Sequence, residues 1–311
     1  MDKVLCIGAA HIDRKATAQS DVLLGTSIPV SVSASLGGVA RNVAENLARL
    51  QCPGALLSRI GNDAEGEMVL SGCRSLNIDT RMLSRSTAFP TASYTALIDR
   101  KGDMIVGLAN MEIYDELTPS LLEPLMPEMQ KHSLWFVDTN LPVATLKSIL
   151  ASSRRFATVF VDPVSVAKAK KLQGLLANID YLFPSRDEAE ALSGISIRTG
   201  SDAERAGKKL CGLGVKHAVI TLGAEGVCVT SAGSSWRLPA LAAASVHDVT
   251  GAGDALAAGV IFGIVTSLPL GASIRFGIAA ATLTIETDYT VNPLLSAQLL
   301  SAKAKEIESC A

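Results

Sequence analysis

Short apolar runs recur along the chain, and stretches with helical periodicity lie between them. The runs are continuous rather than alternating, so each predicts a strand that is buried on both faces. Between two of them, Val43, Leu47 and Leu50 recur on one face of an amphipathic helix expected over residues 41–50. This alternation predicts a doubly wound, mostly parallel sheet with helices on both faces. The predicted buried strands are residues 4–7, 134–137, 158–161, 181–183 and 218–222.

Two stretches break the alternation and predict a small, half-exposed antiparallel sheet. Residues 31–35 alternate small polar and apolar side chains, and residues 92–98 and 104–108 flank a polar hairpin turn. A small sheet inserted between strand–helix units is a candidate lid. The expected plan is a single domain over residues 1–311, with lid strands inserted at about 14–36 and 90–111.

The most apolar region, residues 255–285, has the length of a membrane span. It is interrupted by Ser267, Pro269 and Arg275, which a membrane-spanning helix would not carry together. The sequence therefore predicts two buried helices joined near residues 268–271.

Charge and cysteine usage narrow the classes of function. Lys and Arg total 28 against 30 Asp and Glu, a net charge of −2, with no basic run. Nucleic acid and membrane surfaces are therefore excluded as partners, because the chain has no cluster of basic residues that would bind their negative charge. The six cysteines form no CxxC pair and lie mostly in apolar runs, which is typical of a reducing compartment, so we expect a cytoplasmic protein.

Acidic residues follow several of the predicted buried strands. Asp13 comes shortly after the first strand, and Asp138 and Asp162 come directly after two others. In an open α/β sheet, ligands bind outside the carboxyl ends of the strands, so these carboxylates indicate a polar ligand such as a polyol. The alternative is that they cap helices or accept hydrogen bonds from loop amides.

A glycine turn leads into the first of the two long apolar helices. Gly251, Ala252 and Gly253 would leave backbone N–H groups unpaired at the helix N-terminus, which forms an anion site. Asp254, in the first turn, could take a proton from an attacking hydroxyl in phosphoryl transfer. Leu256 replaces the third glycine of a dinucleotide fingerprint, and a P-loop lysine is absent. A plain Asp cap after a glycine turn is the alternative.

A second glycine pair, Gly37 and Gly38, also leads into a helix, and Asn42 in its first turn can hydrogen-bond hydroxyl groups. Together, the two segments resemble the paired signatures of the ribokinase-like (PfkB) sugar and nucleoside kinases, and the order and spacing fit essentially the whole chain. Within that family the chain is most similar to the subgroup that phosphorylates pseudouridine, whose pattern includes Arg41. The segments that carry this similarity are residues 37–48, 162–165, 188–194 and 289–293.

The resemblance implies a three-layer α/β/α fold with a β-sheet lid, and ATP- and Mg²⁺-dependent phosphorylation of a nucleoside 5′-hydroxyl, with pseudouridine as the expected substrate. It implies that Asp254 is the catalytic base and that Gly251, Ala252 and Gly253 form the anion hole. The implied substrate-binding residues are Asp13, Gly38, Asn42, Asn110, Met111, Asp138, Asn140 and Lys168. The implied ATP-binding residues are Ser185, Glu188, Thr221, Gly223, Gly226, Thr250 and Asn292. Glu188 would organise Mg²⁺ through water, and Asp248 and Thr250 would contribute to a K⁺ site.

Two positions depart from the family pattern. Ser185 stands where the family usually has Asn, and Asn110 stands where the subgroup tends to have Asp. The alternatives are another sugar or nucleoside kinase of this fold, a non-catalytic nucleoside-binding sensor, and a nicotinamide-dependent dehydrogenase, which the glycine spacing disfavours. Asp254 and Glu188 argue against the sensor. Exposed lid strands invite pairing across a two-fold axis, so we expect a homodimer.

Overall fold

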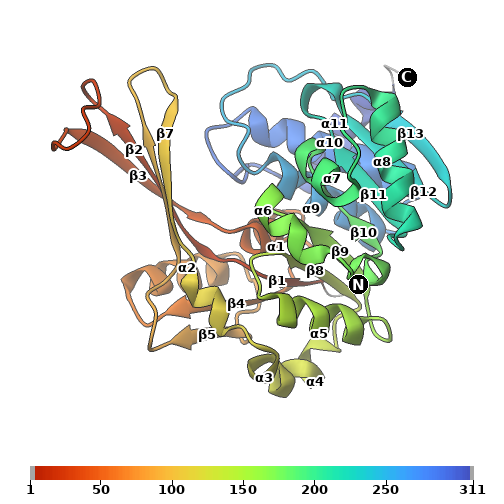
Figure 1. Cartoon of the computed structure of the whole chain (residues 1–311), viewed down its shortest axis with the longest axis horizontal. Coiled ribbons are helices and arrows are strands. Elements are labelled where there is room, and N and C mark those ends of the chain that lie inside the picture. Colours follow the sequence, from red (N-terminus) through yellow and green to blue (C-terminus); the bar gives the residue numbers. More distant parts are fainter. Residues whose placement is uncertain (1–3, 309–311) are drawn as a thin grey trace.

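A nine-stranded sheet forms the centre of the computed structural model of this chain, which describes residues 4–308 (Figure 1). The strands from β11 to β5 run parallel, whereas β12 and β13 are antiparallel additions at one edge. The predicted doubly wound, mostly parallel sheet is therefore confirmed. In spatial order the strands are β13 (Ser234–Leu238), β12 (Val227–Ser231), β11 (His217–Thr221), β10 (Tyr181–Leu182), β9 (Thr158–Asp162), β8 (Leu134–Asp138), β1 (Val4–Ile7), β4 (Ala55–Gly61) and β5 (Leu83–Ser86).

Helices cover both faces of this sheet. In β1, Val4 and Cys6 join the apolar cluster on one face, while Leu5 and Ile7 join the cluster on the other, and all four are fully buried. This two-sided burial is why the strand sequences are continuous apolar runs. The first face carries α1 (Val39–Arg49), α2 (Ala64–Ser75), α9 (Ala252–Val265), α10 (Leu270–Ile285) and α11 (Ala297–Glu308). The second carries α3 (Pro119–Leu122), α4 (Met126–Met129), α5 (Val143–Ser153), α6 (Val166–Ala169), α7 (Arg186–Ser193) and α8 (Gly200–Gly212). Short 3₁₀ turns occupy Glu112–Glu116, Glu123–Leu125, Lys170–Leu172, Leu176–Asn178 and Gly223–Glu225.

The two buried helices expected between residues 255 and 285 are α9 and α10, which pack against each other. The chain turns between them at the expected place, and Pro269 precedes the first residue of α10. Within residues 4–308, no helix combines the length and apolar character needed to cross a bilayer.

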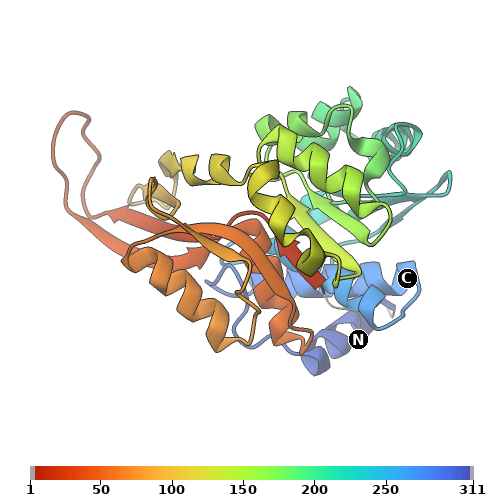
Figure 2. The same ribbon diagram turned by 90° about the horizontal axis from the view of Figure 1, so that it is seen from below.

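The lid is a separate four-stranded sheet that projects from the main body (Figures 1 and 2). Its spatial order is β3 (Val30–Gly37), β2 (His11–Ala18), β6 (Ser93–Ile98) and β7 (Met104–Asn110). The β2–β3 and β6–β7 hairpins are antiparallel, but β2 and β6 pair in parallel. The expectation of a wholly antiparallel lid was therefore wrong, because β2 and β6 enter the lid from the same side, after β1 and β5.

The position of β1 determines where a ligand can bind. The central sheet runs from β1 to β8 on one side and from β1 to β4 on the other, so the direction of strand addition reverses at β1. A crevice opens at the carboxyl ends of the strands at such a switch point. The lid rises from this same edge because β2 follows β1 after three residues.

Candidate active site

The predicted base and a predicted hydroxyl-binding residue meet at this edge. Asp254 lies in the first turn of α9 and Asn42 in the first turn of α1, and the two helices pack against each other. Nδ2 of Asn42 donates a hydrogen bond to Oδ2 of Asp254 at 2.7 Å, and both side chains are buried. The two sequence motifs therefore form one site, although 212 residues separate them.

Arg41 fixes the orientation of the Asn42 amide. Its guanidinium donates to Oδ1 of Asn42 from Nε, at 3.2 Å, and from Nη2, and it also pairs with Glu45. Because Oδ1 accepts from Arg41, the amide nitrogen of Asn42 must face Asp254. Arg41 is therefore a positioning residue, and the sequence analysis noted it only as part of a subgroup pattern.

The environment of Asp254 shifts the pKa of its carboxyl group. Burial is the main cause that raises the pKa of Asp254 to about 7; the hydrogen bond from Asn42 opposes this rise, and the nearby charges of Asp138 and Asp13 add to it. A carboxyl group with a pKa near neutral is suited to accept a proton from a hydroxyl group.

The glycine turn before α9 has the geometry of an anion site. Gly251 has a φ of 82°, and a Cβ there would lie 2.0 Å from the carbonyl oxygen of Thr290. Within residues 4–308, no side chain caps the N-terminus of α9. The backbone N–H groups of its first turn, around Gly253 and Asp254, are therefore available to a ligand such as a phosphate.

Asp138 lies beneath the site and ties its segments together. Its fully buried carboxylate accepts hydrogen bonds from the backbone N–H groups of Ala9 at 2.8 Å and Ala40 at 3.1 Å. It also accepts from the backbone and side-chain nitrogens of Asn140, whose Oδ1 accepts from the Lys168 ammonium. Burial lowers the pKa of Lys168. These hydrogen bonds give Asp138 a positioning role, and its direct contact with a substrate stays a prediction.

A second group of carboxylates lies at the ends of β9 and β10. Asp162 accepts a hydrogen bond from the backbone of Val164, and burial, followed by the charges of Asp254 and Glu188, holds the pKa of Asp162 well above its ordinary value. Ser185 and Glu188 form a capping box on α7, in which Oε2 of Glu188 accepts from the Ser185 N–H at 2.8 Å. Both residues are therefore held by the helix end that they cap.

The side chains do not form a preassembled site for a divalent metal. Among residues 4–308, no group of three or more His, Cys, Asp or Glu side chains could hold a metal ion.

An apolar cavity of about 640 Å³ adjoins the anion site. Thr221, Gly223 and Gly226, expected at the nucleotide, line it, and Ala252 and Gly253 form its end at α9. The volume and the apolar walls suit the flat base of a nucleotide, whose phosphates would reach the N-terminus of α9. Most of these walls carry no motif in the sequence, because they come from the loop before α9 and from α10: Leu241, Val246, Val249, Ile278 and Ile285.

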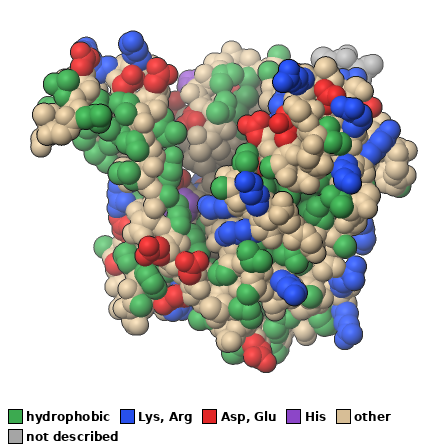
Figure 3. Space-filling view, viewed as in Figure 1, with side chains coloured by type: hydrophobic (Ala, Val, Ile, Leu, Met, Phe, Trp, Pro, Cys, Tyr) green, Lys and Arg blue, Asp and Glu red, His purple; other side chains and the backbone are tan. Residues whose placement is uncertain are grey.

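Asp13 lies on β2 of the lid, and Figure 3 shows a hollow between the lid and the main body. Nε2 of His11 is 3.1 Å from Oδ1 of Asp13, and Tyr94 pairs with Asp13 in the sheet, on the same face. Gly38, with a φ of 101°, lies so close to Ala9 that a Cβ would come within 2.3 Å of its carbonyl oxygen. His11, Asp13 and Tyr94 therefore lie together on one face of the lid.

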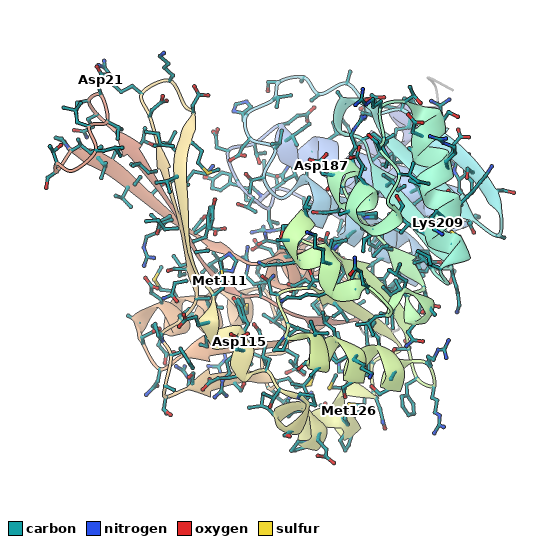
Figure 4. All side chains as sticks on the ribbon, in the orientation of Figure 1. Asp21, Met111, Asp115, Met126, Asp187 and Lys209 are labelled. Atoms are coloured by element: carbon teal, nitrogen blue, oxygen red, sulfur yellow. The ribbon has the colours of Figure 1, made fainter. Side chains whose placement is uncertain are left out.

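Two predicted lid contacts lie elsewhere. Asn110 pairs with Ser93, which pairs with Ile12. Paired residues share a face and neighbouring residues alternate, so Asn110 lies on the face of the lid opposite to Asp13. Met111, at the base of the lid in Figure 4, packs against the apolar cluster on the α3–α8 face. The register therefore does not bring Asn110 to the Asp13 side of the lid, whereas the contact of Met111 with a substrate stays a prediction.

Asn292 does not line the nucleotide cavity either. Its amide donates to the carbonyl oxygen of Leu283 at 2.7 Å and accepts from the N–H of Leu294 at 2.8 Å, and its side chain is buried. Both ends of the amide are occupied by backbone groups, so Asn292 holds the loop after α10.

The expected K⁺ ligands are arranged around a different cation. Oδ1 of Asp248 accepts a hydrogen bond from the Thr250 N–H at 2.8 Å, and its carboxylate pairs with the ammonium of Lys15 on β2. The one anionic ligand expected for K⁺ is thus already neutralised by a side chain. These residues do not fit a resident K⁺ ion.

Fold and site together define an α/β phosphotransferase with a β-sheet lid. A family profile described as pfkB family carbohydrate kinase matches residues 1–297, and the chain belongs to this family. The expected ribokinase-like fold and family are therefore confirmed.

Individual relatives extend over nearly the whole chain. The chain is 32% identical to the pseudouridine kinase of Escherichia coli K12, over 95% of this chain and 94% of that protein. A solved carbohydrate kinase from Agrobacterium tumefaciens is 30% identical, with a TM-score of 0.86, over 98% of this chain and 97% of that one. Arabidopsis thaliana ribokinase, complexed with ribose and ATP, superposes with a TM-score of 0.87 over 98% and 99% of the two chains, but at 20% identity it shows the fold alone.

The buried charge of Asp254 predicts a pH-dependent stability. Since the pKa of Asp254 rises from 3.8 to about 7 on folding, the stabilisation by its protonated form is full below 3.8 and is lost as the pH rises through 7. Asp254→Asn cannot ionise, so we expect the wild type to lose about 2.5 kcal/mol of unfolding free energy relative to this variant between pH 5 and pH 8. Urea unfolding at several pH values measures the gap. Asp21→Asn, at an exposed lid position, should show no such gap, and parallel stability curves for the wild type and Asp254→Asn would contradict the assignment.

Proposed function

We propose that this protein is an ATP-dependent kinase that phosphorylates the 5′-hydroxyl of a nucleoside, with pseudouridine as the preferred substrate. The observation that carries the proposal is the Asn42–Asp254 pair at the uncapped N-terminus of α9, beside a cavity of nucleotide size. The pseudouridine kinase of E. coli, 32% identical over nearly the whole chain, supports the choice of substrate.

The reaction then follows from the positions of the side chains. Asp13, Gly38 and Asn42 would hold the ribose hydroxyls, which leaves the 5′-hydroxyl beside Asp254. Asp254 takes the proton of that hydroxyl, its oxygen attacks the γ-phosphorus of ATP in line, and ADP leaves. The N–H groups of the first turn of α9 stabilise the charge on the transferring phosphoryl group, and closure of the lid keeps water out. Mg²⁺ bound with ATP would neutralise phosphate charge, and Glu188 would hold it through water.

A simple sugar is the second candidate for the acceptor. The register of the lid places Asn110, the residue expected at the nucleobase, on the face opposite to Asp13. On the face that carries Asp13, the lid therefore offers groups that can bind hydroxyls, whereas the residue expected to contact the base lies on the other face. This arrangement favours a ribose-like acceptor as the alternative.

Removal of the base tests the chemistry. Asp254→Asn keeps the size of the side chain and the bond to Asn42 but cannot accept the proton, so kcat should fall by roughly 10²–10⁴-fold. The wild-type rate should rise with pH and level off above about 7 as the carboxylate forms. ADP release in a coupled assay measures both, and ADP binding by calorimetry should change little. Asp21→Asn is the control, and an Asp254→Asn rate within a few-fold of the wild type would refute the assignment.

A substrate panel tests the acceptor. We expect pseudouridine to give the highest kcat/KM among pseudouridine, uridine, cytidine, adenosine and ribose, by about 10²-fold over uridine, because an acceptor for its extra ring N–H would be left unpaired by uridine. Asn110→Asp should leave this ratio unchanged, since Asn110 lies on the other face of the lid. A higher kcat/KM for adenosine or ribose would refute pseudouridine as the preferred substrate but would leave the proposed kinase activity standing.

We also propose that two copies of the chain pair through their lids. The lid exposes large apolar side chains on its outer strands, among them Val32, Met104 and Leu108, each about 60% exposed. Exposed apolar residues on edge strands favour association with a second copy. Sedimentation equilibrium should give twice the mass of 32.4 kDa, and Val32→Lys with Leu108→Lys should give the monomer. A monomeric wild type would refute this pairing.

A reducing compartment such as the cytoplasm is the proposed location. The described cysteines, Cys6, Cys52, Cys73, Cys211 and Cys228, are free, and burial raises the pKa of each thiol. Buried, protonated thiols of this kind are structural and unreactive. Cys310 lies outside the described residues.

A further inference from the structure

Lys15 connects the lid to the loop that forms the anion site. It lies on β2, two residues after Asp13, so the two side chains share one face of the lid. Its ammonium pairs with the carboxylate of Asp248, 233 residues away, in the loop before Gly251. Neither the family pattern nor the sequence analysis gave Lys15 a role.

Asp248 shapes the loop that Lys15 reaches. Its Oδ1 accepts the Thr250 N–H at 2.8 Å, one residue before Gly251, so the carboxylate sets the course of the chain into the glycine turn. An uncompensated negative charge here would lie next to the position of the incoming phosphates. Asp13, Asp162 and Asp254 already make this edge of the sheet acidic, so a positive charge beside Asp248 favours phosphate binding.

We propose that the Lys15 ammonium does at Asp248 what a bound monovalent cation would do: it neutralises the carboxylate that shapes the glycine loop. Phosphoryl transfer then needs no K⁺. Because Lys15 lies on β2, this pair joins the lid directly to the glycine loop. Lys15 acts through Asp248 and is therefore a positioning residue. This inference rests on the proposed kinase function.

The neighbouring residue provides a matched control. Arg14 precedes Lys15 on β2, points to the opposite face of the lid and pairs with Glu65 on α2. Removal of Arg14 breaks a lid contact of the same kind, but it leaves Asp248 neutralised.

The experiment compares Lys15→Met, Lys15→Arg, Arg14→Met and the wild type. Nucleoside-dependent ADP release is measured in choline chloride, and again with K⁺ or NH₄⁺ replacing choline at constant ionic strength, about 100 mM, so that general screening is unchanged. We expect the wild type, Lys15→Arg and Arg14→Met to change by less than about twofold between the salts. Lys15→Met should lose about tenfold or more in kcat/KM for ATP in choline, and K⁺ or NH₄⁺ should restore most of it.

Two results would overturn the proposal. One is stimulation of the wild type by K⁺ of about tenfold or more, which would mean that a diffusible ion is required. The other is a Lys15→Met variant that either matches the wild type in choline or stays impaired in K⁺. Calorimetric binding of ADP provides a readout apart from turnover: its affinity should depend on K⁺ only in Lys15→Met. If no acceptor releases ADP from the wild type, the kinase proposal fails, and the binding measurement still decides the role of Lys15.

Discussion

The carboxylate of Asp138 is the constraint on which the site depends. It is fully buried, where an ionised group is stable only if it is thoroughly hydrogen-bonded, and it gathers N–H donors from the β1–β2 loop, the start of α1 and Asn140. These donors fix the entry of the lid and the first turn of α1. The position of Asn42, and through it that of Asp254, follows from this arrangement.

The same edge of the sheet concentrates negative charge, and the molecule compensates it in several ways. Asp138 is satisfied by N–H donors and Asp248 by the ammonium of Lys15, while burial raises the pKa of Asp162 and raises the pKa of Asp254 to about 7. Such an environment brings the pKa of a carboxyl group close to neutral, where it can both accept and release a proton. It also lowers the stability of the folded chain. The electrostatic strain at Asp254 is thus the physical basis of its proposed role as a base.

The lid has two faces with different tasks. The face that carries Asp13, Lys15 and Tyr94 contacts the glycine loop through Lys15, while Arg14, on the other face, anchors β2 to α2. The register between β2, β6 and β7 assigns each residue to one of these faces. This alternation, and not distance along the chain, separates Asn110 from the proposed acceptor site.

The sequence by itself determined the layered fold and the chemical groups of the site. Continuous apolar runs predict strands buried on both faces, and the two glycine-led helix starts predict where Asn42 and Asp254 lie in their own elements, because helix and strand periodicity are local properties. Only the tertiary structure decided which groups meet. The Asn42–Asp254 bond, the Lys15–Asp248 pair and the apolar walls of the nucleotide cavity each join segments that are distant in sequence. The parallel pairing of β2 with β6 was likewise decided by packing, since no local pattern records the direction in which two separate hairpins enter one sheet.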